Sequence, residues 1–485
     1  MLTTEVIRAN VRSNTTTAPR SFRGGVRNFF RPLTTKLHSP ARYLAATVLF
    51  ALLIRLIIVA IVFRDVSAPT FDHNEFGWEM GWTARSIALG RGFSSPFLPI
   101  TGPTALVPPL YPYLLAGIFK LFGLYSAAAA VVILSLNSLF SALTCIPIYF
   151  SLRHAVNTRL ARIAAFAWAI YPFSIYFAAD RVWDYALTSL LFACCFWAIQ
   201  RLHLRGPWAW LGFSLLLGLT ALSNPSILTV ASFLLLFALL KVHRVGGPWL
   251  RNALIMALTC AAIWAPWGIR NHRVLHSNSV FRDGFWLEFY AGNHGDTSDS
   301  NPPTSHPASN PVEMQKYESL GETAYIAQKR LLALSFVDHH PISFATVSAR
   351  RTLRFWTGYW SFSRAYLTLQ PLDIPNVFFC IFLTACMLRG LWRWWRTDPA
   401  SSLPYLIALL VFPIPYYLTH SSMDYRQPIE PMILAVVIIG LFGLSADSPT
   451  RAREQDALLL NEIAAEEQEE EPSVLVASIA LAPAD

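Results

Sequence analysis

Long apolar runs alternate with short polar segments along most of the chain. A helix needs about 20 predominantly apolar residues to cross a bilayer, because each residue adds only about 1.5 Å to its length. Ten runs are of spanning length, so the pattern predicts an all-α polytopic membrane protein. The predicted spans are 43–63, 126–152, 160–179, 184–202, 207–223, 225–241, 252–269, 372–391, 402–419 and 428–446.

One further apolar run, PPLYPYLLAGIFKLFG at 108–123, has only 16 residues, three prolines and a lysine, Lys120. Counting it as an eleventh span would invert every later loop. It is therefore predicted to be an interfacial or re-entrant helix on the outer face.

The basic residues indicate the orientation. Alternate loops carry Lys and Arg, whereas the short loops between them carry only Arg181 and Arg426. Because cytoplasmic loops are enriched in Lys and Arg, the chain is predicted to have both termini in the cytoplasm and two sizeable outer loops, 64–125 and 270–371. The basic loop residues are Arg153, Arg159, Arg162, Arg201, Arg205, Lys241, Arg244, Arg251, Arg389, Arg393 and Arg396.

Composition narrows the class of protein. Hydrophobic residues make up 54% and charged residues 14%, against about 25% charged in soluble domains, which excludes a disordered chain, an ordinary cytosolic enzyme and a nucleic-acid binder. The segment 447–485 has two Arg and ten acids, so its net charge is −8 within a total of +9. The predicted organisation is a basic cytoplasmic tail (1–42), a transmembrane domain (43–446) and an acidic cytoplasmic tail (447–485).

Polar residues gather where the predicted spans end on the outer side, rather than in mid-span as transporters place them. An outer rim of carboxylates and arginines above an apolar bundle suits an amphiphile with an anionic head and a lipid tail. These residues are Asp180, Arg181, Asp184, Asn224, Arg270, Asn271, Asp424, Tyr425 and Arg426.

Three acids in the first outer loop could act as a general base. Asp72, Glu75 and Glu79 are spaced by three and four residues, so a helix would align them on one face. Carboxylates crowded near a membrane raise one another's pKa, which favours proton acceptance. The alternative is a solvated loop face. Arginines such as Arg85 and Arg91 could hold a phosphate through two parallel hydrogen bonds, or could instead contact lipid headgroups.

Several motifs resemble those of bacterial GT-C glycosyltransferases, the membrane enzymes related to protein O-mannosyltransferases and lipid A aminoarabinose transferase (family 39-like). The resemblance covers about 43–446, and the motifs agree in order and membrane side with the predicted topology. They are the run from Glu79 through ARSIALGRGF (84–93), GPTALVPPLYPYLLAGIFKLFG (102–123), PWGIRN (266–271), Gly292-Asn293 and YRQPIEP (425–431).

The resemblance implies transfer of a sugar from a polyprenyl-phosphate donor to a lipid, glycan or protein acceptor on the outer face of the bacterial inner membrane, with inversion. An acid would deprotonate the acceptor, and arginines, with a divalent cation in some members, would steady the phosphate. No cofactor is certain. The implied catalytic candidates are Glu79, Asp72 and Glu75, and the substrate-binding candidates are Arg85, Arg91, Tyr111, Asp184, Arg270, Asn293, Tyr425 and Arg426.

The chain departs from the family at one important place. Many members have an Asp-Glu pair where this chain has Phe76-Gly77. By register Glu79 is the favoured base, followed by Asp72, which comes after an aromatic residue. A transporter or flippase of lipid-linked glycans, and a non-catalytic scaffold, are the alternative functions. His294, His339 and His340 are expected to be solvated rather than metal ligands.

Overall fold

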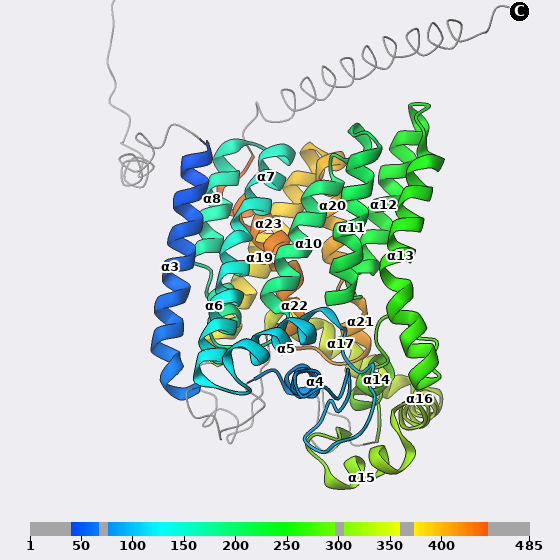
Figure 1. Cartoon of the computed structure of the whole chain (residues 1–485). Helices are drawn as coiled ribbons and strands as arrows, with labels where there is room; N and C mark the ends of the chain where they lie inside the picture. Colours follow the sequence, from blue (N-terminus) through cyan, green and yellow to red (C-terminus); the bar gives the residue numbers. More distant parts are fainter. Residues whose placement is uncertain (1–39, 67–75, 296–304, 359–372, 445–485) are drawn as a thin grey trace, which may run out of the picture. The chain divides into compact units, whose positions relative to one another are not determined.

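Regular structure is entirely helical in the part of the chain that the structure describes, which is residues 40–66, 76–295, 305–358 and 373–444. The structure is a computed structural model, and Figure 1 shows its long helices running side by side. By its contacts the chain divides into two units, with the boundary between Ala46 and Thr47 inside α3. Every contact described below lies within residues 47–444.

Helices occupy all ten predicted spans, in several cases as two consecutive helices. In chain order they are α3 (Pro40–Val66), α6 (Ala127–Leu143) with α7 (Cys145–Ala155), α8 (Thr158–Ala169) with α9 (Pro172–Ala179), α10 (Tyr185–Ile199), α11 (Pro207–Ser223), α12 (Ile227–Arg244), α13 (Trp249–Leu275), α19 (Asp373–Thr397), α20 (Pro399–Val411) with α21 (Ile414–Leu418), and α22 (Met423–Arg426) with α23 (Glu430–Phe442).

The prediction of an all-α polytopic membrane protein is confirmed. Among the described residues, seven helices are long and apolar enough to cross a membrane, or eight if α8 and α9, bent by 43°, are one span. α10 and α11 have 15 and 17 residues and are shorter apolar helices. Length therefore supports seven or eight of the ten predicted spans.

Side chains at the helix starts explain several boundaries. Ser126, Asn157 and Asp398 each accept a hydrogen bond from the backbone N–H three residues later, at the starts of α6, α8 and α20. Such caps satisfy N–H groups that have no partner inside the helix. Pro172 and Pro207 occupy the first turn of α9 and α11, where the missing proline N–H costs nothing.

The break between α8 and α9 is stabilised by an arginine from α3. Arg55 is fully buried and donates to the carbonyls of Trp168 and Ala169 and to the hydroxyl of Ser174. Its Nε donates to Ser141. A broken helix inside a bilayer leaves carbonyls without partners, and neighbouring side chains must satisfy them. Arg55 therefore has a structural role in the bundle.

The remaining helices lie near one end of the long helices in Figure 1. α5 has 13 residues, about 20 Å of helix, and is too short to cross a bilayer, in agreement with the interfacial prediction. These helices are α4 (Trp78–Ala88), α5 (Leu110–Phe122), α14 (Phe285–Gly292), α15 (Pro311–Leu320), α16 (Glu322–His339) and α17 (Pro341–Thr357).

The predicted tails, 1–42 and 447–485, lie outside the described residues except for the start of α3 at Pro40.

Candidate active site

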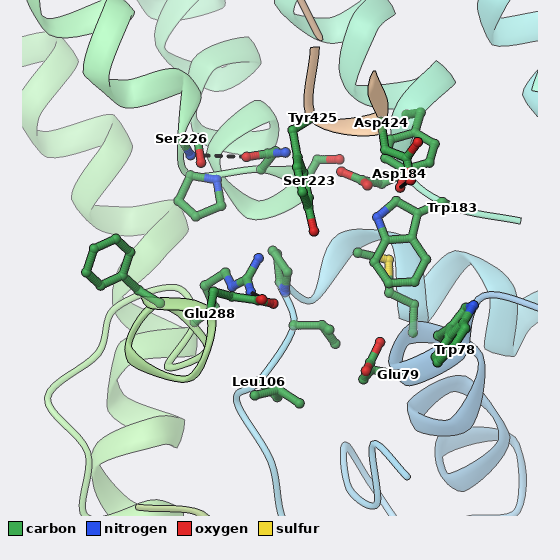
Figure 2. A pocket seen from close by; sticks show the side chains of 18 of the residues that line it. Trp78, Glu79, Leu106, Trp183, Asp184, Ser223, Ser226, Glu288, Asp424 and Tyr425 are labelled. Carbon is green, nitrogen blue, oxygen red and sulfur yellow. Dashed lines mark hydrogen bonds and ion pairs between the residues drawn. The ribbon is translucent and has the colours of Figure 1, made fainter. Parts of the chain in front are cut away.

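A cavity of about 780 Å³ lies among loops and helix ends near α4 (Figure 2). This volume is typical of small-molecule sites, which measure roughly 300–1,000 Å³. Residues far apart in sequence line it, including Asp184, Asn224 and Asp424, which the sequence predicts at the same ends of different spans. The ionisable residues in its wall are Glu79, Arg181, Asp184, Arg282, Glu288, His306, His420, Asp424 and several tyrosines.

Glu79 lies in the first turn of α4, and Figure 2 shows its carboxylate pointing into the cavity. Its side chain is 13% exposed, and Oε1 lies 3.6 Å from Nε2 of His306. Burial raises the pKa of Glu79, while His306 lowers it; more distant Glu288 and Arg282 act in opposite senses. A raised carboxyl pKa is the property that a general base near neutral pH requires.

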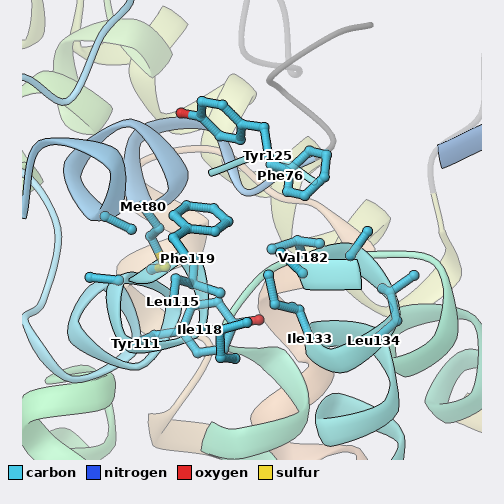
Figure 3. Packing of buried hydrophobic residues seen from close by; sticks show 14 of the residues in the cluster. Phe76, Met80, Tyr111, Leu115, Ile118, Phe119, Tyr125, Ile133, Leu134 and Val182 are labelled. Carbon is cyan, nitrogen blue, oxygen red and sulfur yellow. The ribbon is translucent and has the colours of Figure 1, made fainter. Parts of the chain in front are cut away.

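The start of α4 explains why Phe76-Gly77 replaces the family's acidic pair. Gly77 has φ 98°, and a Cβ there would lie 2.7 Å from the carbonyl oxygen of Val182. Phe76 is 2% exposed and packs against Phe119 and Tyr125 in the apolar cluster of Figure 3. Position 76 thus faces the apolar cluster, position 77 has no space for a Cβ, and the first acid on α4 is Glu79.

A chain of polar contacts crosses the opposite part of the cavity from Glu79. Arg282 Nη2 lies 3.7 Å from Glu288 Oε1, and His420 Nδ1 lies 3.6 Å from Glu288 Oε2. The other ring nitrogen of His420 is 2.6 Å from the hydroxyl of Tyr425. Burial lowers the pKa of His420, and Glu288 raises it.

Two further carboxylates lie beside the ends of α9, α10 and α22. Asp184 is 2% exposed and accepts a hydrogen bond of 2.7 Å from Thr188. Asp424 accepts one of 3.2 Å from Tyr185. Arg181 pairs with Asp180 at 3.4 Å and is half exposed. Arg181 and Arg282 are thus two cations in the cavity wall.

Aromatic side chains complete the wall. Trp78 and Trp183 lie on the Glu79 side in Figure 2, and Phe281 and Phe285 lie near Arg282 in the sequence. Indole and phenyl faces bury large apolar areas with little loss of side-chain freedom. A cavity with aromatic faces, carboxylates and arginines can hold a polar ring together with an anionic group.

Three of the eleven predicted site residues, Glu79, Asp184 and Tyr425, line the cavity. Asp72 and Glu75 lie outside the described residues. The other six, described in the next paragraphs, do not line it. His339 and His340 are exposed, as expected for solvated histidines, whereas His294 is half-buried and its ring lies 5.1 Å from that of Tyr290.

Arg270 supports the cavity wall from behind. Its guanidinium donates to the carbonyl oxygens of Thr104 at 2.5 Å and Phe93 at 2.6 Å. It also lies 5.0 Å from the ring centre of Trp267. These contacts hold both ends of the loop between α4 and α5, which continues into the cavity residue Leu106.

Arg85 and Arg91 are on or just after α4 and face away from the cavity lining. Arg85 donates to the carbonyl of Leu98 at 3.2 Å and lies 4.4 Å from the ring centre of Trp82. Arg91 is exposed.

Tyr111 and Asn293 each bind neighbouring protein groups. Tyr111 is 1% exposed and pairs with Asn137 of α6. Asn293 donates to the carbonyl of Leu418 at 2.8 Å and accepts from Arg351. Both side chains join helices near the site.

Arg426 forms a buried ion pair with Glu430, one turn further along the chain. Glu430 also accepts a 2.7 Å hydrogen bond from Tyr171. Nη1 of Arg426 donates to the carbonyl of Phe355, and its guanidinium faces the ring of Phe173. Its charge is thus already compensated by a protein carboxylate.

Sequence reasoning missed Arg282, Glu288, His306 and His420. They lie between α13 and α15 or between α21 and α22, where no helical periodicity distinguishes one polar residue from another. The motif FRDGFWLEF (281–289) carries the available signal, because it places an arginine and two acids among aromatic residues.

No three His, Cys, Asp or Glu side chains in the described ranges come together in a way that could hold a metal ion. The described residues therefore do not fit a divalent-cation site, and no step below involves one.

Comparisons agree with the family resemblance in part of the chain. Residues 106–267 match the family model described as dolichyl-phosphate-mannose-protein mannosyltransferase, which is 162 of the 485 residues. The chain is thus a helical multi-pass membrane protein that resembles the GT-C glycosyltransferases. The predicted resemblance is confirmed over this segment. No curated protein matches the whole sequence at a significant level.

Solved structures give weaker similarities. The archaeal oligosaccharyltransferase AglB from Archaeoglobus fulgidus, in complex with an inhibitory peptide and a dolichol-phosphate, is 14% identical with a TM-score of 0.42 over 80% of this chain. The chain spans 50% of that protein's length. ArnT from Cupriavidus metallidurans, bound to undecaprenyl phosphate, is 13% identical with a TM-score of 0.36, covering 81% of this chain and 77% of that one. At these scores neither structure assigns a substrate to this chain.

Proposed function

We propose that this protein is a membrane glycosyltransferase that moves a sugar from a polyprenyl-phosphate donor to an acceptor hydroxyl, with inversion at the anomeric carbon. The observation that carries the proposal is the cavity itself. It combines a largely buried carboxylate, Glu79, with two arginines and several aromatic faces at the ends of apolar helices. The family match over 106–267 supports the same reaction class.

Arg282 and Arg181 are the proposed partners of the donor phosphate. Both line the cavity, and a guanidinium can form two parallel hydrogen bonds to phosphate oxygens. Arg426, a substrate-binding candidate from the sequence, is not assigned to the phosphate, because it is paired with Glu430 and does not line the cavity. The apolar helices around the cavity provide the surface along which a polyprenyl tail extends.

In the proposed reaction Glu79 accepts the proton of the acceptor hydroxyl as its oxygen attacks the anomeric carbon. The bond between that carbon and the phosphate oxygen breaks, and the electron pair leaves with the polyprenyl phosphate. Arg282 and Arg181 offset the charge that develops on the departing phosphate, which is the usual electrostatic contribution to such a step. Attack and departure on opposite faces of the sugar give inversion.

The positive-inside pattern supports an outward-facing site in the bacterial inner membrane, since the short loops that contribute to the cavity, near Asp184, Asn224 and Asp424, carry few Lys and Arg. The acceptor would then be a lipid, glycan or protein on that side. Reporter fusions test this orientation at two positions. An outside signal at Gly295 and an inside signal at Arg396 are expected, and a cytoplasmic signal at Gly295 would contradict the proposal.

The reaction is tested in two stages. Mass spectrometry of lipid-linked glycans from a deletion strain and its parent first identifies the sugar that accumulates on polyprenyl phosphate. Purified protein in nanodiscs then transfers the labelled sugar from that donor. Glu79→Gln keeps the size of the side chain but cannot accept a proton, so the rate should fall by about 10²–10⁴-fold.

Glu318→Gln is the matched control, because Glu318 is an exposed carboxylate on α15, and this variant should keep full activity.

The raised pKa of Glu79 adds a second readout. A base must be ionised to work, so kcat/KM should fall as the pH drops through a value above the ordinary carboxyl range. Full activity of Glu79→Gln would remove the proposed base.

A further inference from the structure

His306 reaches Glu79 from a distant part of the chain. Residue 306 precedes α15 in the second outer segment, whereas Glu79 begins α4 in the first. Nε2 of His306 lies 3.6 Å from Oε1 of Glu79, and the two side chains are only 11% and 13% exposed. The imidazole edge also packs against the ring of Phe97 at 5.7 Å between centres. The ring is therefore held in place beside the carboxylate.

A backbone contact fixes which ring nitrogen of His306 carries the proton. The N–H of Ala308 points at Nδ1, with a nitrogen-to-nitrogen distance of 3.2 Å. Since Nδ1 accepts this hydrogen bond, it is unprotonated, and the proton of the neutral ring must be on Nε2. Nε2 is the atom that faces Glu79, so the ring presents a donor to the carboxylate.

We propose that His306 is a positioning residue for Glu79: its Nε2–H faces Oε1 from 3.6 Å, a separation that must shorten slightly to become a hydrogen bond, and there it orients the carboxylate in the cavity and favours its ionised form. This inference rests on the proposed function of Glu79 as the general base. With Oε1 facing His306, Oε2 is the oxygen that takes the proton of the acceptor hydroxyl. His306 itself neither gains nor loses a proton in this step.

The balance of charges around Glu79 makes this contact important. Burial of Glu79 favours its protonated form, and Glu288 adds to that effect. Arg282 and His306 oppose it, and His420 is the other titratable ring facing the same cavity. A polar N–H that faces a carboxylate from 3.6 Å stabilises its charged form more than a distant charge does. Loss of His306 should therefore raise the pKa of Glu79 further.

Three substitutions of His306 distinguish the effect of its Nε2–H donor from the effect of the imidazole ring itself. In His306→Gln the amide nitrogen can reach the position of Nε2 and can still donate to Glu79. In His306→Asn the shorter side chain places its amide near the former Nδ1 position, so it cannot. His306→Ala removes the group altogether. His272→Gln, at an exposed histidine on α13, is the control for substitution elsewhere.

The measurement is the pH profile of kcat/KM for sugar transfer in nanodiscs, with the donor identified as described above. We expect the acidic limb to move up by about one pH unit in His306→Ala and His306→Asn. One pKa unit changes the ionised fraction about tenfold below the pKa, so activity on the acidic limb should fall about tenfold and recover at higher pH. His306→Gln should restore most of the wild-type profile.

An unmoved acidic limb in both His306→Ala and His306→Asn would overturn the inference. So would a loss of activity in His306→Gln as large as in His306→Asn, since the ring rather than the donor would then matter. Activity abolished by a chelator and restored by Zn²⁺ would also contradict it, because a metal at Nε2 would require the other tautomer. Glu79→Gln distinguishes the two proposals. If this variant stays active, the assignment of Glu79 as the base fails. If it loses activity while the acidic limb of the His306 variants does not move, only the role of His306 fails.

Discussion

Two glutamates with little exposed surface, Glu322 and Glu79, have opposite surroundings. Glu322 opens α16 and accepts hydrogen bonds from the Thr104 hydroxyl at 2.5 Å, the Ala105 N–H at 2.6 Å and the Tyr317 hydroxyl at 2.6 Å. Glu79 lies in the first turn of α4, but it faces a cavity, and the imidazole of His306 lies 3.6 Å from its carboxylate. Burial raises the pKa of both glutamates.

The comparison shows that a raised pKa does not by itself identify a catalytic group. The carboxylate of Glu322 is occupied by the protein and joins α16 to the loop before α5. The carboxylate of Glu79 has room for a substrate hydroxyl. Buried polar groups in proteins normally have partners, so a carboxylate whose partner must come from a cavity is the better candidate for chemistry.

The same contrast applies to the arginines. Arg55 is fully buried and directs its donors at backbone carbonyls and hydroxyls of the helix bundle. Arg282 lines the cavity, and its contact with Glu288, at 3.7 Å, is long enough to be exchanged for a substrate anion. An arginine whose donors are all bound to protein acceptors supports the fold, whereas an arginine that faces a cavity is available to bind a phosphate.

After Glu79→Gln, the largest effect on the cavity side is expected for Arg282→Ala. Removing one preorganised donor to a developing anion typically costs about 10²–10³-fold in kcat, whereas the half-exposed guanidinium contributes little to folding. Sugar transfer and thermal unfolding would be measured on the same nanodisc preparation. Arg282→Lys keeps the charge without the planar fork and should recover only part of the rate. Full activity of Arg282→Ala would place the phosphate elsewhere in the cavity.

Glu322→Ala should give the reverse pattern. It leaves the donors of Thr104, Ala105 and Tyr317 without their acceptor, and each unsatisfied buried donor costs about 1–3 kcal/mol. The melting temperature should therefore fall clearly, while the folded fraction loses far less activity than Arg282→Ala does. An unchanged melting temperature would show that water replaces the carboxylate at no cost, and the contrast with Glu79 would lose its basis.

The amino-acid pattern predicts the architecture well, because about 20 apolar residues can satisfy their backbone in lipid only as a helix. The helices at the ten predicted spans and the short α5 follow from that constraint. The same physics predicts that Asp184 and Tyr425 meet at one end, since both come where helices end on the same side. It does not fix which side chains then face the cavity.

Arg426 illustrates the limit. Its motif resembles the family's, but the residue one turn later, Glu430, neutralises it. The spacing of four residues does not tell whether Arg426 pairs with Glu430 or binds a ligand instead. His306 illustrates the converse, because its proximity to Glu79 depends on how the second outer segment folds over the first. Such tertiary contacts carry no local sequence signal.

The smallest effect is expected for Arg91→Ala, because Arg91, unlike Arg282, does not line the cavity. Arg91 lies in a family-like motif, and substrate binding was predicted for it from that motif, but its side chain is exposed and does not line the cavity. Substitutions at such positions usually change stability by no more than about 0.5 kcal/mol, so both the melting temperature and kcat/KM should stay within about twofold of the wild type. Arg282→Ala in the same assay is the positive control. A tenfold or greater rise in KM for the donor, with kcat retained, would show that Arg91 reaches the donor headgroup from outside the cavity. The motif would then be a better guide to binding than the geometry of the cavity wall.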